Sequence, residues 1–157
     1  MQGKYFSFGA TSAVITGLAV IIGLSRTANP VIGITTALVV IAIADNISDS
    51  FGIHIHQESQ KESVEEVRKT TFTNFVTRVA VVSVFVLLVI LLPVNAAVAV
   101  SIFFGMAVIS VISYFIAKER DAKPHKIVFQ HLLITVLVII GSYFLREAGA
   151  RLIAKFG

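Results

Sequence analysis

Five long runs of apolar residues dominate the chain, and short polar or charged segments separate them. A helix needs about 20 mostly apolar residues to cross the hydrocarbon core of a membrane, where every backbone polar group must be satisfied within the segment. Each break between the runs carries a proline or a cluster of charges. The pattern predicts five transmembrane helices, at about residues 8–24, 31–55, 75–92, 94–117 and 127–145.

The segments outside these runs are short. Residues 56–74 predict an acidic and basic cytosolic connector. Residues 146–156 predict an amphipathic tail that lies at the membrane surface, with Leu152, Ile153 and Phe156 towards lipid. The expected fold class is therefore an all-α integral membrane protein, with residues 1–157 forming one transmembrane domain in the lipid bilayer.

The composition supports this class. Hydrophobic residues make up 56% of the chain and charged residues only 14%, a balance that is rare in soluble domains. Cysteine is absent from the sequence, which excludes disulfides and thiolate metal sites.

The basic residues predict the orientation, because short loops rich in Lys and Arg stay on the cytoplasmic side. We expect a cytoplasmic amino terminus and a carboxyl terminus outside. In that orientation nine basic residues face the cytoplasm: Lys4, Lys61, Arg68, Lys69, Arg78, Lys118, Arg120, Lys123 and Lys126. The other four are Arg26, Arg146, Arg151 and Lys155. The net charge of +4 is thus interpreted as a consequence of membrane topology. The sequence has no stripe of basic residues among exposed aromatic residues, so we expect no nucleic-acid partner.

Two carboxylates lie within the second apolar run. Asp45 and Asp49 are four residues apart, so they share a helix face, and Ser48 lies close to it. A charge at membrane depth costs about 3 kcal/mol or more, so such residues usually line a cavity or pathway. Carboxylate pairs suit a divalent cation, or a relay that exchanges protons against one. The alternative is structural, with Asp49 paired to a basic residue such as Arg78 and Asp45 held by a hydrogen bond.

The connector adds a second group of candidate ligands. If the second helix continues beyond the membrane, one stripe contains His54, Glu58, Glu62 and either Glu65 or Glu66. Stripes of Glu with His assemble metal sites in helical bundles, usually with more than one helix contributing. His56 lies nearer the face of the two aspartates, because residues two apart point to nearly opposite sides of a helix. The alternative is a solvated face balanced by basic neighbours.

Two further patterns limit the possible chemistry. His131, about one turn inside the fifth run, is predicted to be a hydrogen-bonded histidine of the bundle. The sequence contains no glycine-rich phosphate loop, nucleophile elbow or triad spacing, so we do not expect an enzyme.

Residues 8–16 (Phe-Gly-Ala-Thr-Ser-Ala-Val-Ile-Thr) and 43–52 (Ile-Ala-Asp-Asn-Ile-Ser-Asp-Ser-Phe-Gly) resemble the first two spans of the vacuolar iron transporter family. Residues 113–118 and 141–143 are similar in layout to its last two spans. The resemblance implies a five-span homodimer that moves Fe²⁺ or Mn²⁺ out of the cytosol in exchange for protons. The metal ion would be the transported substrate rather than a tightly bound cofactor.

The resemblance also assigns roles to particular positions. Asp45 matches the family's Ala-Asp in the second span, and the acidic connector is similar to a shortened form of its Glu-rich cytosolic domain. Three positions depart from the family: Ser12 replaces an aspartate, Asp49 a methionine, and Ile53 a glutamate. The implied transport path contains Asp45, Asp49, Ser12 and Ser48. The implied cytosolic capture residues are His54, His56, Glu58, Glu62, Glu65 and Glu66.

Two hypotheses of function follow. The first is a divalent cation transporter in the cell membrane of a prokaryote, in which Asp49 replaces the missing carboxylate. The second is a non-transporting relative, either a membrane scaffold or a metal sensor.

Overall fold

The computed structural model describes the backbone of residues 3–156 and the side chains of residues 7–155. The side chains of Lys4 and Phe156, used in the predictions above, lie outside this range. All the described regular structure is helical: α1 (Gly3–Leu24), α2 (Pro30–Val40), the π-helix η1 (Ile41–Asp45), α3 (Asn46–Ser59), α4 (Val64–Leu91), α5 (Val94–Glu119) and α6 (Pro124–Phe156). The all-α prediction is confirmed.

Five helical segments in the described part of the chain are long and apolar enough to cross a membrane. They are Ser7–Leu24, Pro30–Ser59, Val64–Leu91, Val94–Glu119 and Pro124–Lys155. Large apolar side chains also cover the outside of the bundle; Phe103, Leu91 and Leu145 are each at least 74% exposed. This is consistent with an integral membrane protein.

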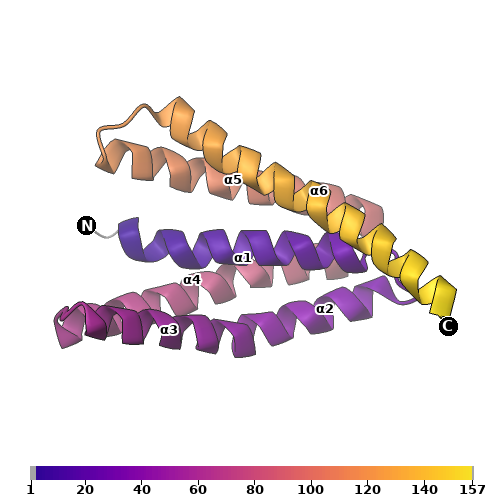
Figure 1. Cartoon of the computed structure of the whole chain (residues 1–157), viewed down its shortest axis with the longest axis horizontal. Helices are drawn as coiled ribbons and strands as arrows, with labels where there is room; N and C mark the ends of the chain where they lie inside the picture. Colours follow the sequence, from indigo (N-terminus) through magenta and orange to yellow (C-terminus); the bar gives the residue numbers. More distant parts are fainter. Residues whose placement is uncertain (1–2, 157) are drawn as a thin grey trace.

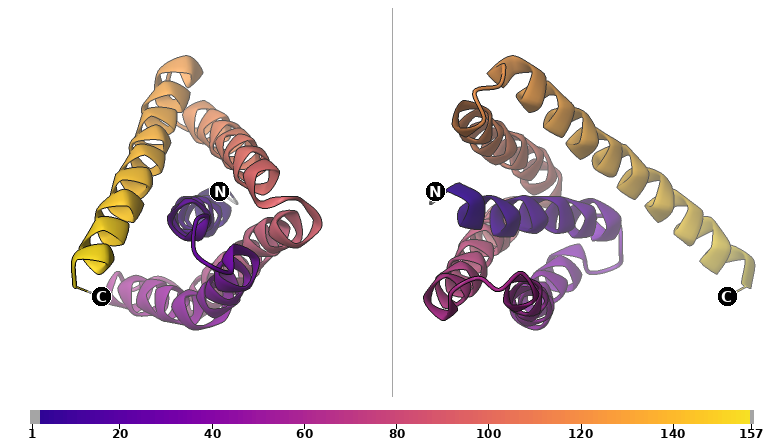
Figure 2. Two further views of the ribbon diagram at one scale, coloured as in Figure 1. Left: turned by 90° about the vertical axis from the view of Figure 1, so that its right-hand side faces the viewer. Right: turned by 60° about the vertical axis from the view of Figure 1, so that its left-hand side comes forward.

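Helix α1 is the centre of the bundle. The end-on view in Figure 2 shows α1 surrounded by α6, α5, α4 and the α2–α3 segment, and its residues Ala13, Val14 and Leu18 are fully buried. Helix α3 packs against α4, and α5 packs against α6. The amino terminus, the α3–α4 turn and the α5–α6 turn lie at one end of the bundle (Figure 1). This end is called the connector end below.

The connector is almost entirely helical, whereas the sequence predicted a separate segment at residues 56–74. Helix α3 continues to Ser59 and α4 begins at Val64. Ser63 caps α4 by accepting a hydrogen bond from the Glu66 backbone N–H (3.3 Å). Lys61 adopts a left-handed φ of 57° in the turn between the two helices. Helix α4 extends through the charged residues because one face remains buried against its neighbours, with Val67 only 1% exposed.

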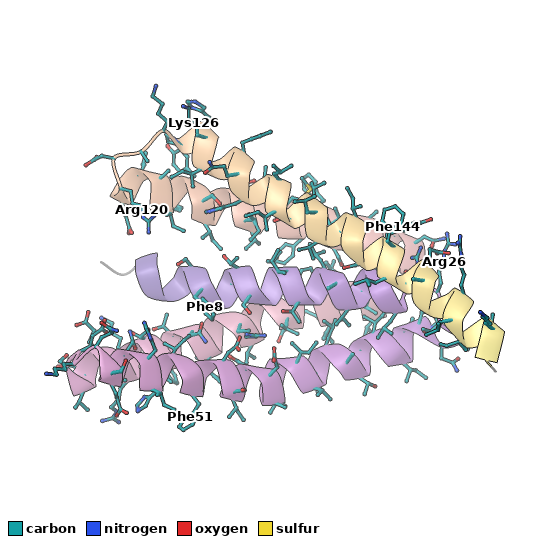
Figure 3. The ribbon with its side chains drawn as sticks, in the orientation of Figure 1. Phe8, Arg26, Phe51, Arg120, Lys126 and Phe144 are labelled. Carbon is teal, nitrogen blue, oxygen red and sulfur yellow. The ribbon has the colours of Figure 1, made fainter. Side chains whose placement is uncertain are left out.

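The predicted amphipathic tail is the continuation of α6, which has no break at Arg146. Arg146 Nη1 donates to Ser25 Oγ at the end of α1 (3.0 Å), and its guanidinium lies over the Tyr143 ring (4.5 Å). The contact with Ser25 holds α6 at Arg146 against the end of α1, at the end opposite the connector end, near the labelled Arg26 and Phe144 in Figure 3. The helix therefore continues through the charged residues.

Candidate functional site

A buried arginine joins the two predicted carboxylates. Arg78, on α4, is only 1% exposed. Its Nη2 contacts Asp45 Oδ2 and its Nη1 contacts Asp49 Oδ2. The side chains of Asp45 and Asp49 are 47% and 33% exposed. These three residues form a charged triad, with the cation inside the bundle and the anions at its edge.

Ser12 connects the charged triad to the central helix α1. Arg78 Nη1 donates to Ser12 Oγ (2.9 Å), and Ser12 Oγ donates to Asp49 Oδ2 (3.3 Å). Three of the four predicted path residues, Ser12, Asp45 and Asp49, are therefore in one cluster. The cluster fixes α1, α4 and the second span to one another.

A layer of buried polar side chains lies next to the charged triad. Asn46 Nδ2 donates to the Phe75 carbonyl on α4 (2.9 Å), and Ser50 Oγ donates to Asn46 Oδ1 (3.4 Å). Asn74 Nδ2 donates to Ser50 Oγ (3.1 Å). The sequence interpretation missed this layer, although the four-residue spacing of Asn74 and Arg78, at the start of the third apolar run, is its signal. The layer sets the register between α3 and α4. That register brings Arg78 of α4 into contact with both carboxylates of the second span.

The second span is locally a π-helix where it reaches the charged triad. The π-turn covers Ile41–Asp45, so Asp45 is its last residue and Asn46 begins α3. Such wide turns occur mostly as single insertions in α-helices, frequently at functional sites. Here the insertion marks the level at which the helix changes from an apolar to a polar inner face.

A groove leads from the connector end to Asp49. It has a volume of about 760 Å³ and lies between α3 and α4, next to Phe8 of α1. Its polar lining includes Ser48, Asp49, His56, Glu62, Glu66 and Asn74. We call it the acidic groove. Asn74 is fully buried, and its Oδ1 has no hydrogen-bond partner among the described residues. This oxygen faces Gly9 of α1, where an added Cβ would lie 2.8 Å from it, so it is packed between the two helices and is not open to the groove.

The predicted capture residues separate into two sets. His56, Glu62 and Glu66 line the acidic groove together with Asp49. His54 lines a different groove, and its Nε2 lies 3.3 Å from Glu58 Oε1. Glu65 is exposed and lines neither.

The single stripe expected from sequence does not form, because α3 ends at Ser59 and the chain reverses at Lys61. No group of three or more His, Cys, Asp or Glu side chains is arranged to hold a metal ion within the described range. His131 is a hydrogen-bonded histidine as predicted, with Nδ1 2.7 Å from Ser113 Oγ.

The fold and the site together define a bundle of five membrane-length helices with an ionic cluster in its interior. No family model, curated protein or solved structure matches the chain. The resemblance to the vacuolar iron transporter family therefore stays a prediction.

Proposed function

We propose that this chain is a five-span membrane transporter that moves a divalent cation, Fe²⁺ or Mn²⁺, out of the cytosol of a prokaryote in exchange for protons. In this proposal the amino terminus is cytoplasmic, the carboxyl terminus is outside, and two copies form a homodimer. The metal ion is the substrate.

The observation that carries this proposal is the acidic groove, which ends at the Asp49 carboxylate at the edge of the bundle. Glu62 and Glu66 lie at the connector end of the groove, and Asp49 lies at the other end, next to Arg78. Intramembrane carboxylates at the end of a polar cavity are typical of ion pathways, and transporter sites commonly lie where a helix departs from regular geometry. The groove residues would concentrate cations from the cytosol.

Arg78 has a defined part in this mechanism. A guanidinium stays charged in proteins, so Arg78 competes with a metal ion for the same carboxylates. Because each carboxylate contacts Arg78 through Oδ2, its Oδ1 is the atom available to an entering ion. Arg78 would offset one of the two negative charges when the site is empty, and the ion would displace it from Asp49. A second copy would double the number of carboxylates around the ion.

A second candidate function also has a supporting observation. Arg78 contacts both carboxylates, and no set of three metal-binding side chains is formed in the range that the structure describes. A non-transporting scaffold or a metal sensor would use the charged triad only to fix α1, α4 and the second span. It would assemble normally and show no metal flux.

Flux of Mn²⁺ and Fe²⁺ into proteoliposomes across a pH gradient tests the proposal. We expect the wild-type protein to transport the metal ion and the Asp49→Asn variant to show a flux lower by about tenfold or more. Even residues that only hydrogen-bond to a metal ligand change metal affinity by about 10–100-fold when they are replaced. Asp45 remains to hold Arg78 in this variant, so the fold should be retained. Circular dichroism and size-exclusion chromatography check that.

Neighbouring glutamates provide a matched control. Glu62→Gln with Glu66→Gln should raise the metal concentration for half-maximal flux by about threefold, because local potential concentrates the ion. Glu58→Gln with Glu65→Gln removes the same charge outside the acidic groove and should change little. Absence of flux from folded wild-type protein would overturn transport. Metal binding without flux would favour the sensor.

A further inference from the structure

The α3–α4 pair has a second groove that shares no residue with the acidic groove. It has a volume of about 700 Å³. Its lining includes three aromatic rings and three basic or titratable side chains: Phe51, Phe72, Phe75, His54, Arg68 and Lys69. We call it the basic groove.

The apolar part of the basic groove is open to the surroundings of the bundle. Phe51 is 63% exposed and Phe72 is 70% exposed, and Figure 3 shows Phe51 pointing away from the bundle. Two such rings in one groove are expected to face lipid rather than water. The groove wall therefore suits a hydrocarbon chain.

The cationic part lies towards the connector end. Arg68 is four residues before Phe72, so it lies one helical turn nearer the α3–α4 turn on the same face of α4. Neither Arg68 nor Lys69 makes an ion pair with another described residue within 4 Å. Glu58 on α3 contacts His54, and Glu65, four residues before Lys69 on α4, makes no ion pair with it within 4 Å. Two cations are therefore available at the rim of an apolar groove.

We propose that the basic groove binds one anionic phospholipid, with its phosphate between Arg68 and Lys69 and an acyl chain along the phenylalanine rings. This proposal rests on the membrane placement proposed above, but not on metal transport. Basic pockets between transmembrane helices on the cytoplasmic side are suited to acidic headgroups. A symmetric contact with a second copy through this groove fits less well, because it would bring Arg68 and Lys69 of both copies into one interface.

Tryptophan fluorescence tests the proposal directly, because the chain contains no tryptophan. The Phe72→Trp variant therefore has a single reporter in the groove. It is reconstituted in phosphatidylcholine vesicles that contain increasing fractions of brominated phosphatidylglycerol or brominated phosphatidylcholine. We expect half-maximal quenching at about a tenfold lower fraction of the anionic lipid, from the attraction of two basic side chains.

Two controls separate the groove from the general attraction of a basic surface. Phe115→Trp places the reporter on α5, where Phe115 is 60% exposed and Lys118 and Arg120 are close in sequence; it should show no such preference. Adding Arg68→Gln and Lys69→Gln to Phe72→Trp should abolish the preference. Adding Lys118→Gln and Arg120→Gln should leave it intact.

Three results would overturn the proposal. Equal quenching by both lipids would indicate a non-selective lipid surface. Protection from both lipids that disappears as protein is diluted in the membrane would assign the groove to a second copy. Quenching at neither reporter position would contradict the membrane placement itself. A protein that transports no metal would still give any of these fluorescence results. Failure of the transport proposal can therefore be distinguished from failure of the lipid-binding proposal.

Discussion

Replacing both carboxylates of the charged triad, with Asp45→Asn and Asp49→Asn together, is expected to destabilise the protein by about 3–5 kcal/mol. This is the usual cost of removing one partner of a buried ion pair and leaving the other charge unpaired. Arg78 is only 1% exposed and cannot lose its proton, so its charge would remain in the bundle without a counter-ion. The measurement is unfolding in detergent micelles by titration with dodecyl sulfate, followed by helical circular dichroism.

Two further variants make this expectation specific. Arg78→Met should cost less, because Asp45 and Asp49 are 47% and 33% exposed, whereas Arg78 is buried, and Asp49 already lines the acidic groove. The triple variant that combines all three substitutions should recover most of the lost stability, because a buried ion pair can often be replaced by uncharged groups at little cost. A double variant as stable as wild type would show that these carboxylates do not hold Arg78.

The expected difference in stability between the double variant and the single Asp49→Asn variant also guides the transport experiment. Loss of flux in the Asp45→Asn, Asp49→Asn protein could result from unfolding alone, whereas Asp49→Asn leaves one counter-ion on Arg78. Comparison of flux with unfolding for the single and triple variants therefore separates a role in ion binding from a role in stability.

The sequence predicted the number of membrane-length helices because the rule behind it is local. A run of apolar residues long enough to span hydrocarbon can be recognised without knowledge of its neighbours. The ends of the helices were less predictable. Charges at residues 64–74 and at Arg146 were interpreted as breaks, yet burial of Val67 and the contact of Arg146 with Ser25 keep both helices continuous. Those contacts are tertiary and are not visible in a hydropathy pattern.

The candidate site was partly predictable for the same reason. The four-residue spacing of Asp45 and Asp49 indicated a shared face, and the structure has both in contact with one residue, Arg78. Arg78 entered the sequence interpretation as one of the basic residues facing the cytoplasm and as an alternative partner of Asp49, whereas it is buried in the bundle. Its contact with both carboxylates depends on the register between α3 and α4, which Asn46 and the Phe75 carbonyl help to fix. That register, like the π-turn at Ile41–Asp45, has no proline or glycine signal in the sequence.

Gly9→Ala is expected to destabilise the protein by about 1–3 kcal/mol, the usual penalty for overpacking a well-packed contact. A Cβ at Gly9 would lie 2.7 Å from the Asn74 carbonyl oxygen and 2.8 Å from Asn74 Oδ1. The carbonyl belongs to the α4 backbone, so the clash is relieved only if α1 moves away from α4. Ser12 is three residues further along α1 and would move with it, which should lengthen its 2.9 Å contact with Arg78. The same dodecyl sulfate titration measures the loss of stability.

Gly23→Ala is the matched control, because it makes the same substitution in the same helix where nothing lies within 4 Å of the added Cβ. It should be neutral or stabilising by up to about 1 kcal/mol, since alanine favours a helix more than glycine does. Equal stability of the two variants would mean that α1 and α4 do not approach closely at Gly9. A loss of stability confined to Gly9→Ala would instead show that α1 and α4 are in close contact at this glycine.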